Sequence, residues 1–112
     1  MTTVTLYSSA DDRLTGFEVS GHSGYAEAGA DIVCAAVTSC VRMVECALND
    51  ILGLEASVKV KEEDAVITLK LPAKLSQARD SICQTLLMAF LVHMTTLAEE
   101  FPENLIVLNM EV

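Results

Sequence analysis

The alternation of apolar and polar residues predicts two strands near the N-terminus. Val4 and Leu6 alternate with polar neighbours, and Phe17 and Val19 do so again after a turn that contains two adjacent aspartates. An apolar residue at every second position is typical of a strand that buries one face. We therefore expect a pair of neighbouring strands in the first 20 residues of the chain.

Two longer segments repeat their apolar residues at helical spacing. The first runs from about Ile32 to Leu52 and is followed by Gly53, and glycine is common just after the end of a helix. The second begins near Ser76, whose side chain can cap a helix start, and ends before Pro102. The residue that precedes a proline avoids helical geometry, so we expect the second helix to stop there.

Three shorter runs predict the remaining strands. Ser57–Lys61 and Ala65–Leu71 flank an acidic turn and form a hairpin, and Leu105–Met110 forms a last strand. The predicted order of elements is ββαββαβ. With 112 residues, the chain (1–112) is expected to be a single small α+β domain. In this fold, one mostly antiparallel sheet is covered by two long helices.

An angular count along the first predicted helix places Cys34 at the boundary between core and solvent. The count assigns these residues to the core face: Val33, Val37, Cys40, Val44, Ala47, Leu48 and Ile51. It assigns these to a polar stripe that faces water: Thr38, Arg42, Glu45 and Asn49. A thiol between the two faces can be both positioned by the core and reached from solvent.

The same count argues against a metal site. Cys34, Cys40 and Cys46 point in three different directions on one helix and cannot converge on an ion. The chain has no CxxC or HxxxH spacing. We expect neither a metal nor another cofactor.

The net charge and the N-terminal sequence argue against several further classes of protein. Sixteen acidic and seven basic residues give a formal net charge of −9, which disfavours direct binding to nucleic acid and is compatible with a basic partner. The N-terminus does not have the pattern of a signal peptide, and no run approaches the roughly 18 apolar residues of a membrane span. With four cysteines and no export signal, we expect a cytoplasmic protein with free thiols and no membrane contact.

The segment between residues 21 and 37 carries the candidate chemistry. Asp31 is a favourable N-cap for a helix that starts at Ile32, and Cys34 would then be the third helical residue. Unpaired N–H groups and the positive dipole potential at a helix start stabilise a thiolate over a thiol. The same N–H groups could hold the oxyanion of an attacked carbonyl group. Cys34 is therefore the candidate nucleophile.

A histidine on the preceding glycine-rich loop supplies a candidate base. The carboxylate of Asp31 would tend to raise the pKa of a thiol beside it, so His22 must provide the net activation of Cys34. Gly21, Gly24 and Gly29 give the loop the freedom to close over an extended substrate as a mobile lid. The lid is expected to extend from about residue 23 to residue 30.

Each of these residues also has a plainer interpretation. Cysteine often serves only as a small buried apolar residue, which is the expected role of Cys40, Cys46 and Cys83. His22 could cap backbone groups, and Asp31 is more easily explained as a helix cap than as a third catalytic residue. His93, within the second predicted helix, is expected to be packed or at the rim. Substrate contact by Ser23 or Thr38 is a minor alternative.

One stretch of the chain closely resembles the bacterial ribosomal-processing cysteine proteases, the Prp family. It consists of Gly21-His22, then Gly29, and then Asp31-Ile32-Val33-Cys34-Ala35-Ala36-Val37. The resemblance covers essentially the whole chain and is densest between Gly21 and Thr38. It implies that His22 and Cys34 form the catalytic dyad. Serine is usual in this family at the position of Thr38, and threonine keeps the hydroxyl group.

The resemblance also implies a substrate and an oligomeric state. The family acts as a homodimer and removes a short N-terminal extension from large-subunit ribosomal protein twenty-seven, cutting after a pair of aromatic residues. The resulting hypothesis is a cytoplasmic cysteine endopeptidase that acts on this ribosomal protein precursor. The alternative is a non-enzymatic acidic adaptor or ribosome-assembly module that binds a basic ribosomal protein. A thiol-dependent acyltransferase is disfavoured, because the spaced glycines do not match GxGxxG.

Overall fold

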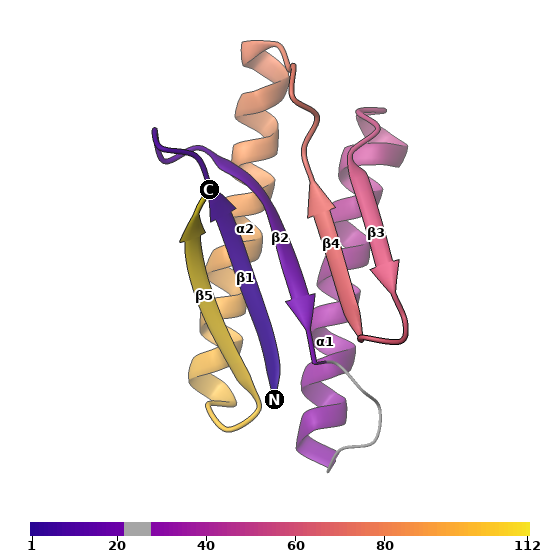
Figure 1. Cartoon of the computed structure of the whole chain (residues 1–112), viewed down its shortest axis with the longest axis vertical. Coiled ribbons are helices and arrows are strands. Elements are labelled where there is room, and N and C mark those ends of the chain that lie inside the picture. Colours follow the sequence, from indigo (N-terminus) through magenta and orange to yellow (C-terminus); the bar gives the residue numbers. More distant parts are fainter. Residues whose placement is uncertain (22–27) are drawn as a thin grey trace.

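Five strands form one sheet in the order β3-β4-β2-β1-β5 in the computed structural model of the chain (Figure 1). The model describes residues 1–21 and 28–112, and in the second stretch it describes side chains from residue 32 onward. The strands are β1 (Thr2–Ser8), β2 (Leu14–Ser20), β3 (Ser57–Lys61), β4 (Val66–Lys70) and β5 (Leu105–Glu111). β1 and β5 pair in parallel, and the other three pairs are antiparallel. The sheet is thus mixed and mostly antiparallel, as expected.

Two helices cover one face of this sheet and leave the other face open (Figure 1). Helix α1 (Ala28–Glu45) continues into a short π-helix, η1 (Cys46–Ile51), and α2 (Gln77–Glu100) lies beside it. The predicted order ββαββαβ and the single α+β domain are confirmed. The predicted hairpin strand over 57–61 has the bounds of β3.

The core lies between the sheet and the helices. The β1–β2 register pairs Val4 with Val19 and Leu6 with Phe17, so that all four side chains share the face beneath the helices. Phe17 stacks on Phe90 of α2 with ring centroids 4.3 Å apart. Burial of these side chains removes apolar surface from water, which is the main force that holds the two layers together.

The start of α2 is fixed by local and long-range hydrogen bonds. The Ser76 hydroxyl accepts from the Arg79 N–H at 3.2 Å, which confirms the predicted cap. The Gln84 side chain exchanges two hydrogen bonds with the backbone of Leu14, and Arg13 forms an ion pair with Asp80 at 2.7 Å. These contacts attach the start of β2 to α2.

The angular count fails at the end of the first helix. Ile51, assigned to the core face, is 76% exposed. Asn49, assigned to the polar stripe, is half-buried and its amide group exchanges hydrogen bonds of 2.7 and 3.1 Å with the backbone of Ala56. The reason is η1: a π-helix places more residues in each turn, so every side chain after Glu45 is rotated from its α-helical position. Val41, which the count did not assign to the core, is buried.

The two helical segments of the chain are more apolar than predicted from the sequence. The segments 32–51 and 77–100 each have a mean hydropathy of 1.5 and are long enough to cross a membrane, so the expectation of no such segment is wrong by length and composition. Each segment nevertheless contributes fully buried residues to the core above the sheet, among them Val37 from the first and Leu87 from the second. Only 28% of the most apolar stretch of each segment is buried, so packing of the domain accounts for part of this apolar character.

Candidate active site

Gly21 fixes the point at which the chain leaves β2 and enters the segment that contains His22. Its φ angle is +79°, a conformation that residues with a side chain rarely adopt. Its N–H donates to the carbonyl of Ala65 at 3.1 Å, and a Cβ at this position would overlap the carbonyl oxygen of Met1. The backbone of Gly21 thus lies between those of Ala65 and Met1, and its part in a mobile lid stays a prediction.

Helix α1 begins earlier than the sequence suggested. It starts at Ala28 rather than at Ile32, so Asp31 is the fourth residue of the helix and not its N-cap. Gly29 also lies inside α1 and not in a loop, which removes residues 28–30 from the expected lid. Alanine at residues 28 and 30 favours this earlier start, and Gly29 between them opposes it. His22, Ser23 and Gly24 lie outside the described residues, so their predicted roles stay predictions.

The longer helix changes the physical account of Cys34. Counted from Ala28, Cys34 is the seventh helical residue and not the third. The unpaired N–H groups of a helix belong to its first four residues, and the dipole effect falls off within the first turn. The predicted activation of the thiol by the helix start is therefore wrong.

The boundary position of Cys34 is confirmed. Its side chain is half-buried, between the fully buried Val33 and the exposed Ala35. Thr38, one turn further along the same side of α1, is also half-buried. Cys34 thus lies at the edge of the core, with its side chain neither fully buried nor fully exposed.

Two of the other three cysteines are less suited to act as the nucleophile. Cys83 is fully buried, and both burial and the charge of Asp80 raise the pKa of its thiol. Burial likewise raises the pKa of Cys40. These two groups are held as thiols at neutral pH, and the thiolate is the reactive form. Cys46 was also expected to be buried, which is wrong: it is exposed on η1, where the π-helix rotates the side chains from their α-helical positions.

The end of β2 and the start of α1 lie at the same end of the molecule (Figure 1). They are joined by residues 22–27, which include His22. The second histidine, His93, is exposed on α2, as the rim position predicted. Among residues 1–21 and 28–112, no three His, Cys, Asp or Glu side chains are arranged to hold a metal ion.

Substituting alanine for Gly21 should damage both stability and activity. The added Cβ would meet backbone atoms of Met1 that cannot move aside easily, at a φ angle that costs about 1–2 kcal/mol by itself. We expect Gly21→Ala to lower the free energy of unfolding by more than about 2 kcal/mol in urea titrations, with a parallel loss of kcat/KM. Gly53→Ala is the matched control: Gly53 has a φ of +64°, but a Cβ there meets nothing within 4 Å. Equal losses in the two variants would contradict the proposed crowding at Met1.

The comparisons with known proteins give one consistent result. The family model for cysteine protease Prp matches residues 1–106. The ribosomal processing cysteine protease Prp of Bacillus subtilis is 29% identical over 105 residues, which cover 94% of each chain.

Solved structures agree with this match. The protein SMU.848 from Streptococcus mutans superposes with a TM-score of 0.87 at 30% identity, over 100% of this chain and 99% of its own. The essential ribosomal processing protease Prp from S. aureus, solved with a substrate peptide, superposes with a TM-score of 0.84 at 20% identity, over 98% and 100%. This second likeness shows a common fold. Given the family match across nearly its whole length, the chain belongs to the Prp family of cysteine proteases.

Proposed function

We propose that this protease removes the N-terminal extension of large-subunit ribosomal protein twenty-seven during ribosome maturation. The observation that carries the proposal is the family match over residues 1–106, which includes the segment from Gly21 to Thr38. The B. subtilis relative is named as a ribosomal processing protease. The S. aureus relative was solved both with a substrate peptide and with a covalently linked product peptide.

In the proposed mechanism, Cys34 is the nucleophile and His22 the base. His22 removes the thiol proton, and the Cys34 sulfur attacks the scissile carbonyl carbon. The C–N bond then breaks, and His22 returns the proton to the leaving amine. In the second half of the reaction, His22 takes a proton from water, the resulting hydroxide attacks the acyl-enzyme, and the C–S bond breaks. Because Cys34 lies beyond the first helical turn, activation of the thiol falls on His22 and not on the helix dipole.

We further propose that the enzyme works as a cytoplasmic homodimer that does not bind nucleic acid directly. The net charge of −9 supports the last point, because it repels phosphate groups. Exposed apolar side chains on α2, such as those of Met88 and Val92, support self-association.

The direct test is cleavage of the precursor. Incubation of the protein with the extended ribosomal precursor should yield a product shortened at its N-terminus, measured by intact mass. A precursor in which the two aromatic residues before the cut are replaced by alanine is the control and should stay intact. Binding of the precursor without shortening would instead support the non-enzymatic adaptor.

A further inference from the structure

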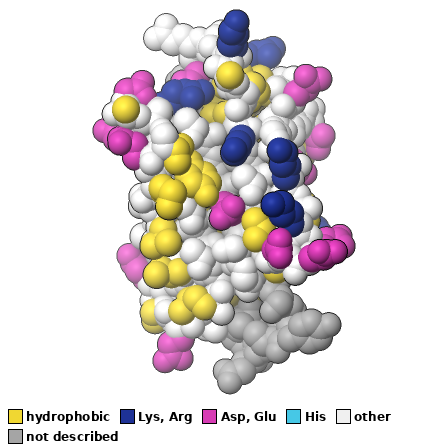
Figure 2. Space-filling view, viewed as in Figure 1, with side chains coloured by type: hydrophobic (Ala, Val, Ile, Leu, Met, Phe, Trp, Pro, Cys, Tyr) yellow, Lys and Arg dark blue, Asp and Glu magenta, His cyan; other side chains and the backbone are white. Residues whose placement is uncertain are grey.

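The two edge strands of the sheet differ in how they are protected from other chains. β3 has five residues and carries Lys59 and Lys61, and lysine on an edge strand is a common defence against unwanted pairing. β5 has seven residues and no charged side chain from Leu105 to Met110. On the open face of the sheet, an apolar stripe follows β5, whereas the lysines lie over β3 and β4 (Figure 2).

The exposed residues of this stripe are unusually apolar for an edge strand. The side chains of Ile106, Leu108 and Met110 are 44%, 43% and 50% exposed. In soluble proteins, a long, flat and apolar edge is a template for pairing with another strand. The β5 edge is therefore suited to receive an extended chain.

The backbone of β5 also offers hydrogen-bonding groups to such a chain. At the start of the β1–β5 pair, the Thr2 N–H donates to the carbonyl of Asn104 at 2.9 Å. In a parallel pair, successive residues direct their backbone groups alternately to one side of the strand and to the other. Even-numbered residues of β5 thus face β1, and Val107 and Asn109 direct their N–H and C=O groups outwards. In the described sheet, no strand lies beyond β5.

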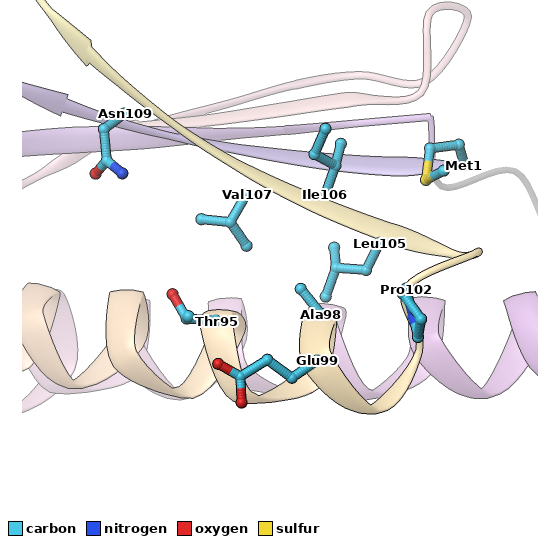
Figure 3. Close-up of a pocket in the computed structure, with 9 residues that line it drawn as sticks. All are labelled: Met1, Thr95, Ala98, Glu99, Pro102, Leu105, Ile106, Val107 and Asn109. Atoms are coloured by element: carbon cyan, nitrogen blue, oxygen red, sulfur yellow. The ribbon is translucent and has the colours of Figure 1, made fainter.

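A groove runs beside this edge, between β5 and α2 (Figure 3). Its volume is about 560 Å³. Leu105, Val107 and Asn109 line it from β5, and Thr95 and Ala98 line it from α2. Side chains alternate across a strand, so a chain added beside β5 would place every second side chain in this groove.

One end of the groove lies beside Gly21, the residue that follows β2. Met1 lines it, and the carbonyl of Met1 is the group that a Cβ on Gly21 would overlap. Gly21 immediately precedes His22 in the chain. A substrate bound at the end of β2 could therefore continue past Met1 into the groove.

The charges around the groove favour a basic occupant. Glu99 lines the groove, and Glu103 and Glu111 are exposed at the two ends of β5. Ribosomal proteins carry an excess of lysine and arginine because they bind RNA phosphates. A second copy of this chain would instead bring a further net charge of −9 against the same carboxylates.

We propose that the β5 edge and its groove bind an extended, positively charged segment of the ribosomal protein substrate, outside the bond that is cleaved. The segment adds as a strand beside Val107 and Asn109 and places alternate side chains next to Thr95, Ala98 and Glu99. This inference rests on the proposed function, because it assigns a second contact to the same substrate.

A matched pair of charge reversals tests the proposal. Glu99 and Glu100 are neighbours at the end of α2, and both are exposed, but of the two only Glu99 lines the groove. We expect Glu99→Lys to raise KM for the whole precursor by about fivefold and to leave kcat unchanged. A short peptide that spans only the cleaved bond should be processed equally by both variants and by the parent enzyme. Glu100→Lys should keep the parent KM for the precursor.

A second pair tests the shape of the groove. Thr95 and Thr96 are both exposed, and each hydroxyl donates to the carbonyl four residues earlier, but only Thr95 lines the groove. Thr95→Lys should weaken binding of the precursor, and Thr96→Lys should not. Amide exchange in the Cys34→Ser variant reports the contact directly. Added precursor should slow exchange at Val107 and Asn109 of β5 and leave the β3 edge unchanged.

The outcomes separate this proposal from the proposed function. If the precursor protects the β5 amides but the parent enzyme does not shorten it, the docking site is supported and the proposed cleavage is overturned. If the parent enzyme cleaves the precursor but the β5 amides are not protected, the docking site is overturned and the proposed function stands. The same holds if Glu99→Lys and Glu100→Lys change the KM for the precursor equally. Protection that increases with protein concentration in the absence of precursor would assign the edge to a second copy and overturn the proposal as well.

Discussion

Cys34→Ser is expected to abolish cleavage of the ribosomal precursor while the fold is preserved. Removal of a catalytic nucleophile lowers kcat by at least about a thousandfold. The half-buried position at the edge of the core accepts serine, which is close to cysteine in size, with little cost in stability. The rate is measured by intact mass of the product, and stability by urea titration.

The other cysteines supply the controls for this variant. Cys40→Ser and Cys83→Ser should keep cleavage and lose about 1–3 kcal/mol of stability, with the larger loss at the fully buried Cys83, because each places a hydroxyl group in an apolar setting. Alkylation at neutral pH should modify Cys34 faster than these two, whose pKa values burial raises. An active Cys34→Ser together with an inactive Cys40→Ser would show that the wrong cysteine was chosen.

His22→Ala should lower kcat by several orders of magnitude. With the helix dipole excluded as the activator of Cys34, the histidine carries all the proton transfers of the proposed mechanism. His93→Ala should stay near the parent rate, because His93 is an exposed residue of α2. Single-turnover kinetics on the precursor measures both variants.

An independent readout distinguishes a base from a structural residue. Added imidazole should restore part of the activity of His22→Ala if the side chain only transfers protons. Unfolding curves must show that the variant is folded. A folded, fully active His22→Ala together with an inactive His93→Ala would overturn the assignment of the base.

The elements that could be predicted from sequence are those determined by neighbouring residues. The hairpin strand at 57–61 follows from alternation, and the start of α2 follows from the side chain of Ser76. Where the prediction was wrong, the competing choices were close in energy. Either Ala28 or Ile32 could begin a helix, and the structure begins it at Ala28, so the N-cap preference of Asp31 did not decide the boundary.

At the candidate site, too, the features that depend on neighbouring residues were predictable and those that depend on distant residues were not. The boundary position of Cys34 follows from a count over one helix, and the structure confirms it. The crowding at Gly21 was not predictable, because the atoms it meets belong to Met1, 20 residues earlier in the chain and just before β1. The groove beside β5 was missed for a similar reason: whether a strand lies at the edge or in the centre of a sheet depends on the strand order and not on the strand's own residues.

The parallel pairing of β1 with β5 has a consequence for how the chain folds. β1 lies between β2 and β5, so one of its edges stays open until the last strand of the chain has been synthesised. Contacts between residues about a hundred positions apart close late, because a long loop must first be ordered. A chain that is still being synthesised, and in which β5 has not yet left the ribosome, therefore exposes the free edge of β1. The last seven-residue strand acts as the closing step of folding, and truncations within it should give insoluble protein rather than a slightly weaker enzyme.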